Sequence, residues 1–144
     1  MASNVIRQAK PSDAEALCCL NRNFNGFDTA DADHIRRCLT VFGPEICLVS
    51  ETDGSLTGYV CGVCFTSLCY RDPVGQITEL YVDPLHRRNG VGEALIRTMI
   101  DHLKQLGTAE ISLLTGCDNM SARILYEKCG FKHEDERFYL LATE

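Results

Sequence analysis

One segment, residues 79–92, constrains the fold more than any other part of the sequence. It begins as an apolar strand, passes through a proline-containing turn, and then places two arginines and two glycines directly before a helix. The first N–H groups of a helix lack internal partners and carry partial positive charge, which favours an anion there. Gly90 and Gly92 allow a bulky phosphate to approach the backbone, and Arg87 and Arg88 add charge. The segment therefore predicts a binding site for a pyrophosphate.

Two common pyrophosphate-binding motifs do not fit this segment. The sequence contains no G-x-x-x-x-G-K-[ST] stretch, which excludes a Walker-type phosphate loop. The dinucleotide fingerprint G-x-G-x-x-G also fails, because Leu95 stands where a third glycine or an alanine is required. The strand-first opening of the dinucleotide-binding fold is missing as well. Considered alone, the remaining glycine pair is also typical of a tight turn that caps a helix.

The rest of the chain alternates between strand and helix patterns. Runs rich in β-branched and aromatic residues predict strands at residues 5–8, 45–50, 56–68, 76–82, 109–114 and 138–141. Helical periodicity predicts helices at residues 11–20, 35–39, 91–106 and 119–129. Asp53-Gly54 is a strong hairpin signal, and Ser12 with Glu15 forms a capping box for the first helix. These patterns predict a mixed α/β domain with a central sheet.

The length of the chain limits the number of domains, and its net charge limits the kinds of partner it can bind. The 144 residues suffice for one core, and we expect a single domain over residues 1–144. The formal net charge of -6 argues against nucleic-acid binding, which requires a basic face. No apolar run approaches the roughly 20 residues that span a bilayer. Residues 1–7 also lack the apolar stretch of a signal peptide, so we expect no membrane association and a cytoplasmic location.

The cysteines offer one competing signal. The chain has nine cysteines, and Cys61 and Cys64 form a C-x-x-C that could be redox-active or half of a zinc site. The motif falls in the middle of an expected strand, where residues three apart point to opposite faces. A redox C-x-x-C begins a helix, and a zinc site needs further ligands. We therefore expect most cysteines to be free thiols and expect no metal.

Two motifs in sequence order resemble those of one enzyme superfamily. Arg87-x-x-Gly90-x-Gly92, directly after the expected strand, resembles the acyl-CoA signature of the GNAT superfamily of N-acetyltransferases. Residues 119–131 resemble the second signature of that superfamily, N-x-x-A-x-x-L-Y-x-K-x-G-F. Residues 6–14 resemble its usual first strand and helix, so the resemblance covers nearly the whole chain.

The resemblance implies a fold and a binding site for acetyl-CoA. The fold would be a central mixed sheet of about six to seven strands flanked by about four helices. Its parallel strands 76–82 and 109–114 would splay apart around the acyl thioester. The backbone expected to grip the pyrophosphate is that of Arg87, Arg88, Asn89, Gly90, Val91 and Gly92. The pantetheine arm would hydrogen-bond the backbone of Leu80, Tyr81 and Val82. The other side would be lined by Asn119, Ala122 and Tyr126.

The implied reaction moves an acetyl group to a primary amine. The amine must be neutral to attack the thioester, so a general base must remove a proton. Glu79 is the expected base, because it is the one carboxylate inside this apolar strand and burial would raise its pKa. A solvated polar residue on an alternating strand is the simpler explanation of Glu79. Tyr126 is the expected acid for the departing thiolate, although it could simply pack its helix on the sheet.

Several alternatives stay open at the level of sequence. A non-catalytic acyl-CoA-binding or sensing module on the same fold is the second function that fits the motifs. The acceptor is unknown and could be a small molecule or a protein amine. Asp28, Asp31 and Asp33 could attract a cationic amine, or could form a solvated loop that caps the next helix. The resemblance also implies that a homodimer could form.

Overall fold

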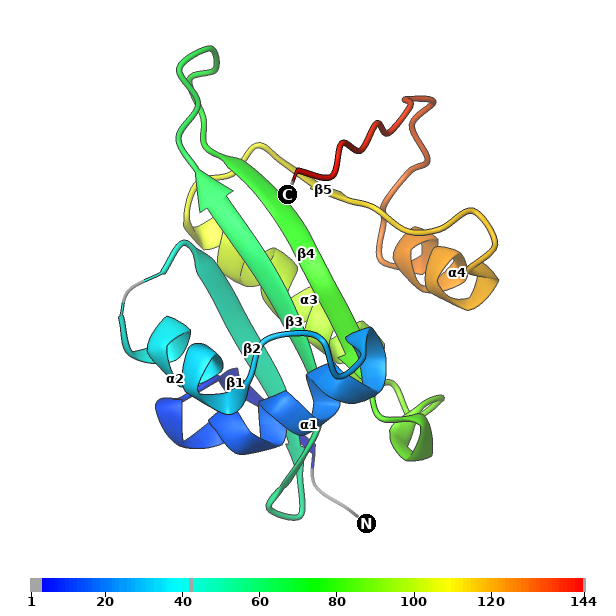
Figure 1. Cartoon of the computed structure of the whole chain (residues 1–144). Coiled ribbons are helices and arrows are strands. Elements are labelled where there is room, and N and C mark those ends of the chain that lie inside the picture. The colour runs from blue at the N-terminus through cyan, green and yellow to red at the C-terminus, as the bar shows by residue number, and fades with distance from the viewer. Residues whose placement is uncertain (1–3, 42, 144) are drawn as a thin grey trace. The chain divides into compact units, whose positions relative to one another are not determined.

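A computed structural model describes residues 4–41 and 43–143 (Figure 1). The chain divides into two compact units, Met1–Leu114 and Thr115–Glu144, which we describe separately. The first unit holds the sheet and three α-helices, and the second holds one α-helix.

The sheet of the first unit has five strands in the order β1-β2-β3-β4-β5. Their bounds are Asn4–Gln8, Glu45–Thr52, Ser55–Phe65, Val74–Val82 and Glu110–Leu113. Neighbours from β1 to β4 are antiparallel, and β4 and β5 are parallel. Within the described residues this is fewer than the expected six to seven strands.

The expected strand at residues 138–141 does not form. Residues 131–143 carry no helix or strand, and the side chains from Phe138 to Leu141 are exposed. A β-branched or aromatic run becomes a strand only when a neighbouring strand satisfies its backbone, and composition does not supply such a partner. The apolar pattern alone was therefore misleading at this position.

The hairpin between β2 and β3 follows the local sequence signal. Asp53 has φ 51 and Gly54 has φ 82, the two positive values that a tight turn of two residues requires. The expected strand at residues 56–68 is shorter than predicted, because β3 ends at Phe65.

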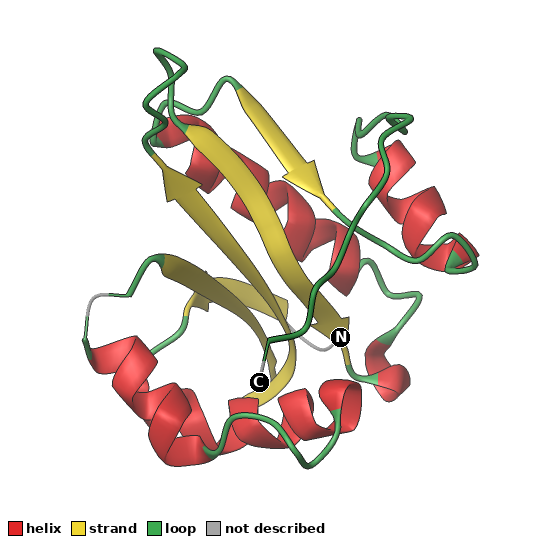
Figure 2. Cartoon of the chain, turned by 45° about the horizontal axis from the view of Figure 1, so that its top comes forward, coloured by secondary structure: helices red, strands yellow, loops and turns green. Residues whose placement is uncertain are grey.

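The helices cover both faces of the sheet. The four α-helices are α1 (Ala14–Asn25), α2 (Ala32–Thr40), α3 (Val91–Gln105) and, in the second unit, α4 (Met120–Lys128). In the first unit, α1 and α2 lie on one face and α3 on the other (Figures 1 and 2). The number of α-helices agrees with the expected four.

The face under α3 forms the more completely buried part of the core. Leu95, Ile96, Met99 and Leu103 of this helix are fully buried. Two glycines of β3 allow the close approach. A Cβ at Gly58 would lie 2.7 Å from the carbonyl oxygen of Tyr81, and one at Gly62 would lie 2.9 Å from Met99 Sδ.

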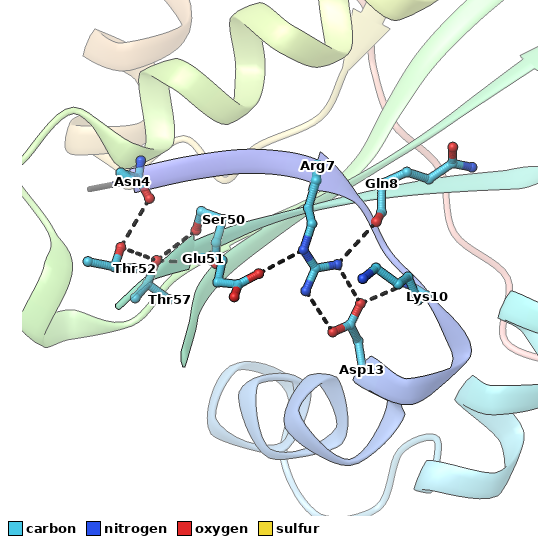
Figure 3. A network of polar contacts seen from close by, with 9 residues as sticks. All are labelled: Asn4, Arg7, Gln8, Lys10, Asp13, Ser50, Glu51, Thr52 and Thr57. Carbon is cyan, nitrogen blue, oxygen red and sulfur yellow. Dashed lines mark hydrogen bonds and ion pairs between the residues drawn. The ribbon is translucent and has the colours of Figure 1, made fainter. Parts of the chain in front are cut away.

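A polar network joins β1 to the start of α1, as Figure 3 shows. Arg7 donates to both carboxyl oxygens of Asp13, at 2.8 and 3.0 Å, and its Nε donates to Glu51 at 2.8 Å. Asp13 also accepts from the backbone N–H of Lys10 at 2.7 Å, within the short helix Pro11–Asp13 that precedes α1. The expected cap at Ser12 is therefore wrong, because the Asp13 carboxylate takes the backbone donor at this helix start.

Candidate functional site

The edge of β4 that faces β5 is open along half of the strand. The parallel pairing of β4 with β5 begins at Val74 and ends with Ile77 opposite Leu113. From Thr78 to Val82, no strand of the described sheet pairs with this edge. Thr78 is also the extra residue of a bulge, since Cys61 pairs with Glu79 and the next residue of β3 pairs with Ile77. We call this unpaired side of β4 the gap. Because β5 ends at Leu113, the expected splay of the two parallel strands stays a prediction.

The direction of the backbone groups along β4 shows which N–H and carbonyl groups lie on its open edge. Asp83 donates its N–H to the carbonyl of Thr57 at 2.8 Å, so its backbone points toward β3. In an antiparallel pair this orientation alternates, and the N–H and carbonyl groups of Leu80 and Val82 point the other way. The Val82 carbonyl accordingly accepts the Nε–H of Arg87 at 2.9 Å. The N–H groups of Leu80 and Val82 are therefore donors toward the gap.

The loop after β4 connects the open edge directly to the start of α3. The short helix Pro84–His86 begins at Asp83, whose carboxyl oxygen accepts from the N–H of Leu85 at 2.9 Å. Arg88 has φ 66, and Gly90, the N-terminal cap of α3, has φ 80. A Cβ at Gly90 would meet nothing within 4 Å, so its backbone is open to a bulky group.

This start of α3 fits a pyrophosphate. The first intrahelical bond runs from Ala94 N–H to the Gly90 carbonyl at 3.0 Å, so the N–H groups of Val91 and Gly92 precede the helical ladder. Arg87 and Arg88 are exposed at the same place, and the Arg87 guanidinium lies 5.6 Å from the centre of the Tyr81 ring. Free helical N–H groups, positive dipole and cationic side chains together are what a phosphate group requires.

Glu79 lies on β4 at the bulge, partly buried. Burial raises the pKa of its carboxyl group, and the nearby negative charge of Glu45 raises it further. A hydrogen bond from the side chain of Asn25 acts in the opposite direction and lowers the pKa. Glu45 is held in place by Thr78, whose hydroxyl donates to it at 2.6 Å. A raised pKa makes this carboxylate a better proton acceptor than an exposed one.

The C-terminal end of α1 forms the neighbourhood of Glu79. Asn25 donates to Asn21 at 2.8 Å, and the hydroxyl of Tyr59 donates to the same Asn21 oxygen at 3.5 Å. Phe24 stacks on Tyr81 with ring centres 5.1 Å apart. Burial raises the pKa of Tyr59, which keeps its hydroxyl protonated.

The sequence did not reveal three neighbours of Glu79, which are Asn25, Glu45 and Thr78. Asn25 and Glu45 are far from Glu79 in the chain, and no local signal identified them. The bulge at Thr78 breaks the simple strand alternation on which the sequence analysis relied.

The remaining predicted site residues belong to the second unit. Asn119 caps α4, and its side chain accepts the N–H of Ala122 at 3.3 Å. Tyr126 makes an edge-to-face contact with Phe131, with ring centres 6.1 Å apart, and its carbonyl accepts the Phe131 N–H at 3.0 Å. The motif residues therefore shape the start and the end of this helix. Glu79 and Tyr126 lie in different units, so the structure does not test their pairing as base and acid.

The acidic loop is largely engaged in local contacts. Asp31 caps α2 by accepting the N–H of His34 at 2.8 Å, and that bond lowers the pKa of its carboxyl group. Asp33 accepts from Arg36 at 2.7 Å. These contacts agree with the capping interpretation of the loop.

The part of the chain that the structure describes contains neither a candidate metal site nor a membrane-spanning helix. Among residues 4–41 and 43–143, no group of three or more His, Cys, Asp or Glu side chains could hold a metal ion. None of the described helices has the length and apolar character needed to cross a bilayer. Cys61 and Cys64 both lie within β3, in the middle of the sheet, as expected.

A family model and individual relatives both identify this chain as similar to N-acetyltransferases. The family model described as acetyltransferase (GNAT) family matches residues 15–131. Human N-acetyltransferase 8 is 33% identical over 91 residues, which cover 63% of this chain and 40% of that protein. The uncharacterized N-acetyltransferase YhfO of Bacillus subtilis is 28% identical over 134 residues, 90% of each chain. The first curated relatives are longer, and this chain spans about two fifths of their length.

The fold is shared with solved structures of low sequence identity. An aminoglycoside N-acetyltransferase in complex with CoA superposes with a TM-score of 0.84 and 17% identity. The superposition covers 99% of this chain and 96% of that structure. At this identity the likeness establishes the fold.

Proposed function

The chain belongs to the acetyltransferase (GNAT) family, and on that premise we propose that it transfers an acetyl group from acetyl-CoA to a primary amine. The observation that carries the proposal is the open edge of β4, which runs directly into the start of α3. Backbone donors for a pantetheine arm and a cradle for a pyrophosphate then follow one another along a single segment, residues 80–92.

In the proposed reaction, the segment Arg87, Arg88, Asn89, Gly90, Val91 and Gly92 holds the pyrophosphate of acetyl-CoA. The backbone of Leu80 and Val82 aligns the pantetheine arm along β4. Tyr81, expected from the sequence to take part, has its backbone groups turned toward β3 instead. Asn119, Ala122 and Tyr126 of α4 line the other side. Coenzyme A supplies the activated thioester, and no metal takes part.

Glu79 removes a proton from the amine, directly or through a water molecule, while the amine nitrogen attacks the thioester carbon. The raised pKa of Glu79 suits this role, because a base whose pKa lies closer to the working pH accepts a proton more readily. The Leu80 N–H, which points into the gap, stabilises the oxyanion that forms on the carbonyl oxygen. Tyr126 then gives a proton to the thiolate as the carbon–sulfur bond breaks.

The acceptor is proposed only as a class, the primary amine of a small molecule or a protein. A pair of carboxylates, Glu45 and Glu79, near the mouth of the gap favours a cationic acceptor over an anionic one. A single domain over residues 1–144, a homodimer and a cytoplasmic location remain predictions from the sequence, as do the expected lack of nucleic-acid and membrane partners.

The proposal is tested by incubating the protein with acetyl-CoA and a panel of amines, including a polyamine, an aminoglycoside and lysine peptides. Release of the CoA thiol that depends on one of these amines supports acyl transfer. Tight acetyl-CoA binding with no turnover for any amine, and no product by mass spectrometry, would favour the binding or sensing module instead.

A further inference from the structure

Cys47 and Cys61 face each other directly across β2 and β3. The Cys47 carbonyl accepts the N–H of Ala9 at 3.0 Å, so its backbone groups point away from β3. The Thr57 carbonyl accepts the N–H of Asp83 and therefore points toward β4. Backbone groups of every second residue point the same way along a strand, so those of Cys61 also point toward β4. The two cysteines therefore form a non-hydrogen-bonded pair, the narrow kind, in which Cα atoms are about 4.5 Å apart.

This geometry is suitable for a disulfide. Disulfide-bonded residues have Cα atoms about 4.4–6.8 Å apart, so the bond could form without a movement of the strands. The Cys47 thiol lies close enough to Cys61 to raise the pKa of its thiol. Both are free and only partly buried. Cys47 Sγ also lies 4.0 Å from the Leu48 carbonyl oxygen, a weak contact that a disulfide would readily replace.

The pair lies in one row with the candidate base. Cys61 pairs with Cys47 on one side and with Glu79 on the other, and residues directly opposite each other point to the same face of a sheet. That face is the one under α1, since both cysteines pack against the cluster that contains Leu17 and Tyr59. A change at the cysteine pair is therefore a change in the wall beside Glu79.

We infer that Cys47 and Cys61 form a reversible disulfide that slows acyl transfer at Glu79. The catalytic half of this inference rests on the proposed function, whereas the formation of the disulfide does not.

The oxidation is a thiol–disulfide exchange with a low-molecular-weight disulfide, RSSR. The Cys47 thiolate attacks one sulfur of RSSR, which forms a mixed disulfide and releases RS⁻. Cys61 then loses its proton and attacks the Cys47 sulfur, which forms the Cys47–Cys61 bond and releases the second RS⁻. The two protein thiols lose two electrons and two protons, and RSSR becomes two RSH. The neighbouring Cys47 thiol and burial raise the pKa of Cys61, so the second step, which needs the Cys61 thiolate, is favoured by higher pH.

The disulfide should affect kcat more than acetyl-CoA binding. Drawing Cys61 toward β2 shifts the side chain opposite Glu79, while the start of α3 and the open edge of β4 are untouched. Catalytic groups are sensitive to small displacements, and about 1 Å can cost about 10²-fold in rate. We expect roughly a tenfold lower kcat with an unchanged KM for acetyl-CoA.

Cys64 supplies a matched control. It lies on the same strand and is also partly buried, yet it points to the opposite face from Cys61 and pairs with Gly75. The C-x-x-C of the sequence is thus not the reactive pair, because the register of the sheet selects a different partner for Cys61.

The experiment treats the full chain with oxidised glutathione and maps disulfides by mass spectrometry of peptides under non-reducing conditions. The expected result is a Cys47–Cys61 cross-link that dithiothreitol removes, in the wild type and in Cys64→Ser alike. In Cys61→Ser, Cys47 should retain bound glutathione. Thermal unfolding of each variant checks that the variant is folded. The disulfide map of the wild type remains a valid test even if one variant does not fold.

A kinetic comparison of the oxidised and reduced proteins completes the test. A fall in kcat that dithiothreitol reverses, present in Cys64→Ser and absent in Cys47→Ser, supports the inference. A Cys61–Cys64 cross-link, or no cross-link at all, overturns it without touching the proposed acyl transfer, because the map needs no acyl donor. Equal kcat in the oxidised and the reduced protein overturns the catalytic half of the inference. A reduced protein that turns over no amine overturns that half too, and it contradicts the proposed function as well.

Discussion

The side chain of Asn25, at the end of α1, lies beside the carboxyl group of Glu79 on β4 and lowers the pKa of that group. This interaction joins a helix to the strand that carries the open edge, and it opposes the effects of burial and of Glu45 on the pKa of Glu79. The protonation of the candidate base is thus set by burial, by Glu45 and by Asn25, and a single substitution can remove either of the last two causes.

The first prediction concerns Glu79 itself. Glu79→Gln keeps the size of the side chain but removes the proton acceptor, so kcat should fall by about 10²-fold or more. The affinity for acetyl-CoA should change little, because the proposed pyrophosphate contacts lie at the start of α3. Steady-state kinetics with calorimetric binding separate the two effects. Wild-type turnover of Glu79→Gln at every pH would place the base elsewhere.

The second prediction concerns the acid limb of the pH profile of kcat/KM. This limb reports the pKa of the free base, since Glu79 must be deprotonated to act. Glu45→Gln removes a like charge and lowers the pKa of Glu79, so the limb should move to lower pH. Asn25→Ala removes a donor to the carboxylate and raises the pKa, so the limb should move to higher pH. Asn23→Ala, an exposed neighbour on α1, serves as the control and should leave the limb in place.

Shifts of both variants in the same direction would contradict the assignment of the limb to Glu79. A limb that does not move in either variant would contradict it as well.

The third prediction concerns two glycines of β3, one packed closely against β4 and the other against α3. A Cβ at Gly58 would press on the backbone carbonyl of Tyr81, which cannot move without disturbing β4, so Gly58→Ala should destabilise by about 1–3 kcal/mol. Gly62→Ala should cost less, because its closest contact is the flexible side chain of Met99. Gly116→Ala, where a Cβ would meet nothing within 4 Å, should be close to neutral. Urea unfolding measures all three, and a larger loss for Gly62→Ala than for Gly58→Ala would contradict this packing.

The fourth prediction concerns the network around Arg7. The hydrogen bond from Arg7 holds the pKa of Asp13 below its usual range, so the ionised carboxylate stabilises the fold above the unfolded pKa of about 3.9. Asp13→Asn should therefore destabilise by about 1–3 kcal/mol at pH 7. The difference from the wild type should shrink as the pH falls through the folded pKa of Asp13.

The control for this prediction is Asp33→Asn. The Asp33 side chain is 77% exposed, against 10% for Asp13, so its pair with Arg36 should contribute less than about 1 kcal/mol. A difference for Asp13→Asn that stayed constant from pH 7 to pH 2 would show that the ion pair is not its cause.

The sequence was informative wherever structure is set by neighbours in the chain. The turn at Asp53-Gly54, the start of α3 at Gly90 and the cap of α4 at Asn119 all follow local rules of backbone conformation and helix capping. The order of the elements followed from the same signals. The family motifs coincide with these places, which is why the binding segment could be predicted.

The features that the sequence did not predict depend on long-range pairing. The apolar run at residues 138–141 has the composition of a strand, but a strand also needs a partner that composition does not reveal. The bulge at Thr78 and the pairing of Cys47 with Cys61 depend on the register between strands. The contact of Asn25 with Glu79 likewise depends on where α1 packs.

The central claim is that the segment from β4 into α3 binds acetyl-CoA. It is tested most directly by calorimetric titration of the wild type with acetyl-CoA, in parallel with the double variant Arg87→Glu/Gly90→Ala. The double variant reverses the charge of Arg87 and places a side chain at Gly90, whose φ is 80, at the start of α3. We predict saturable binding with one acetyl-CoA per chain in the wild type and a loss of at least tenfold in affinity in the variant. No binding to the wild type, or equal binding to both proteins, would contradict the account.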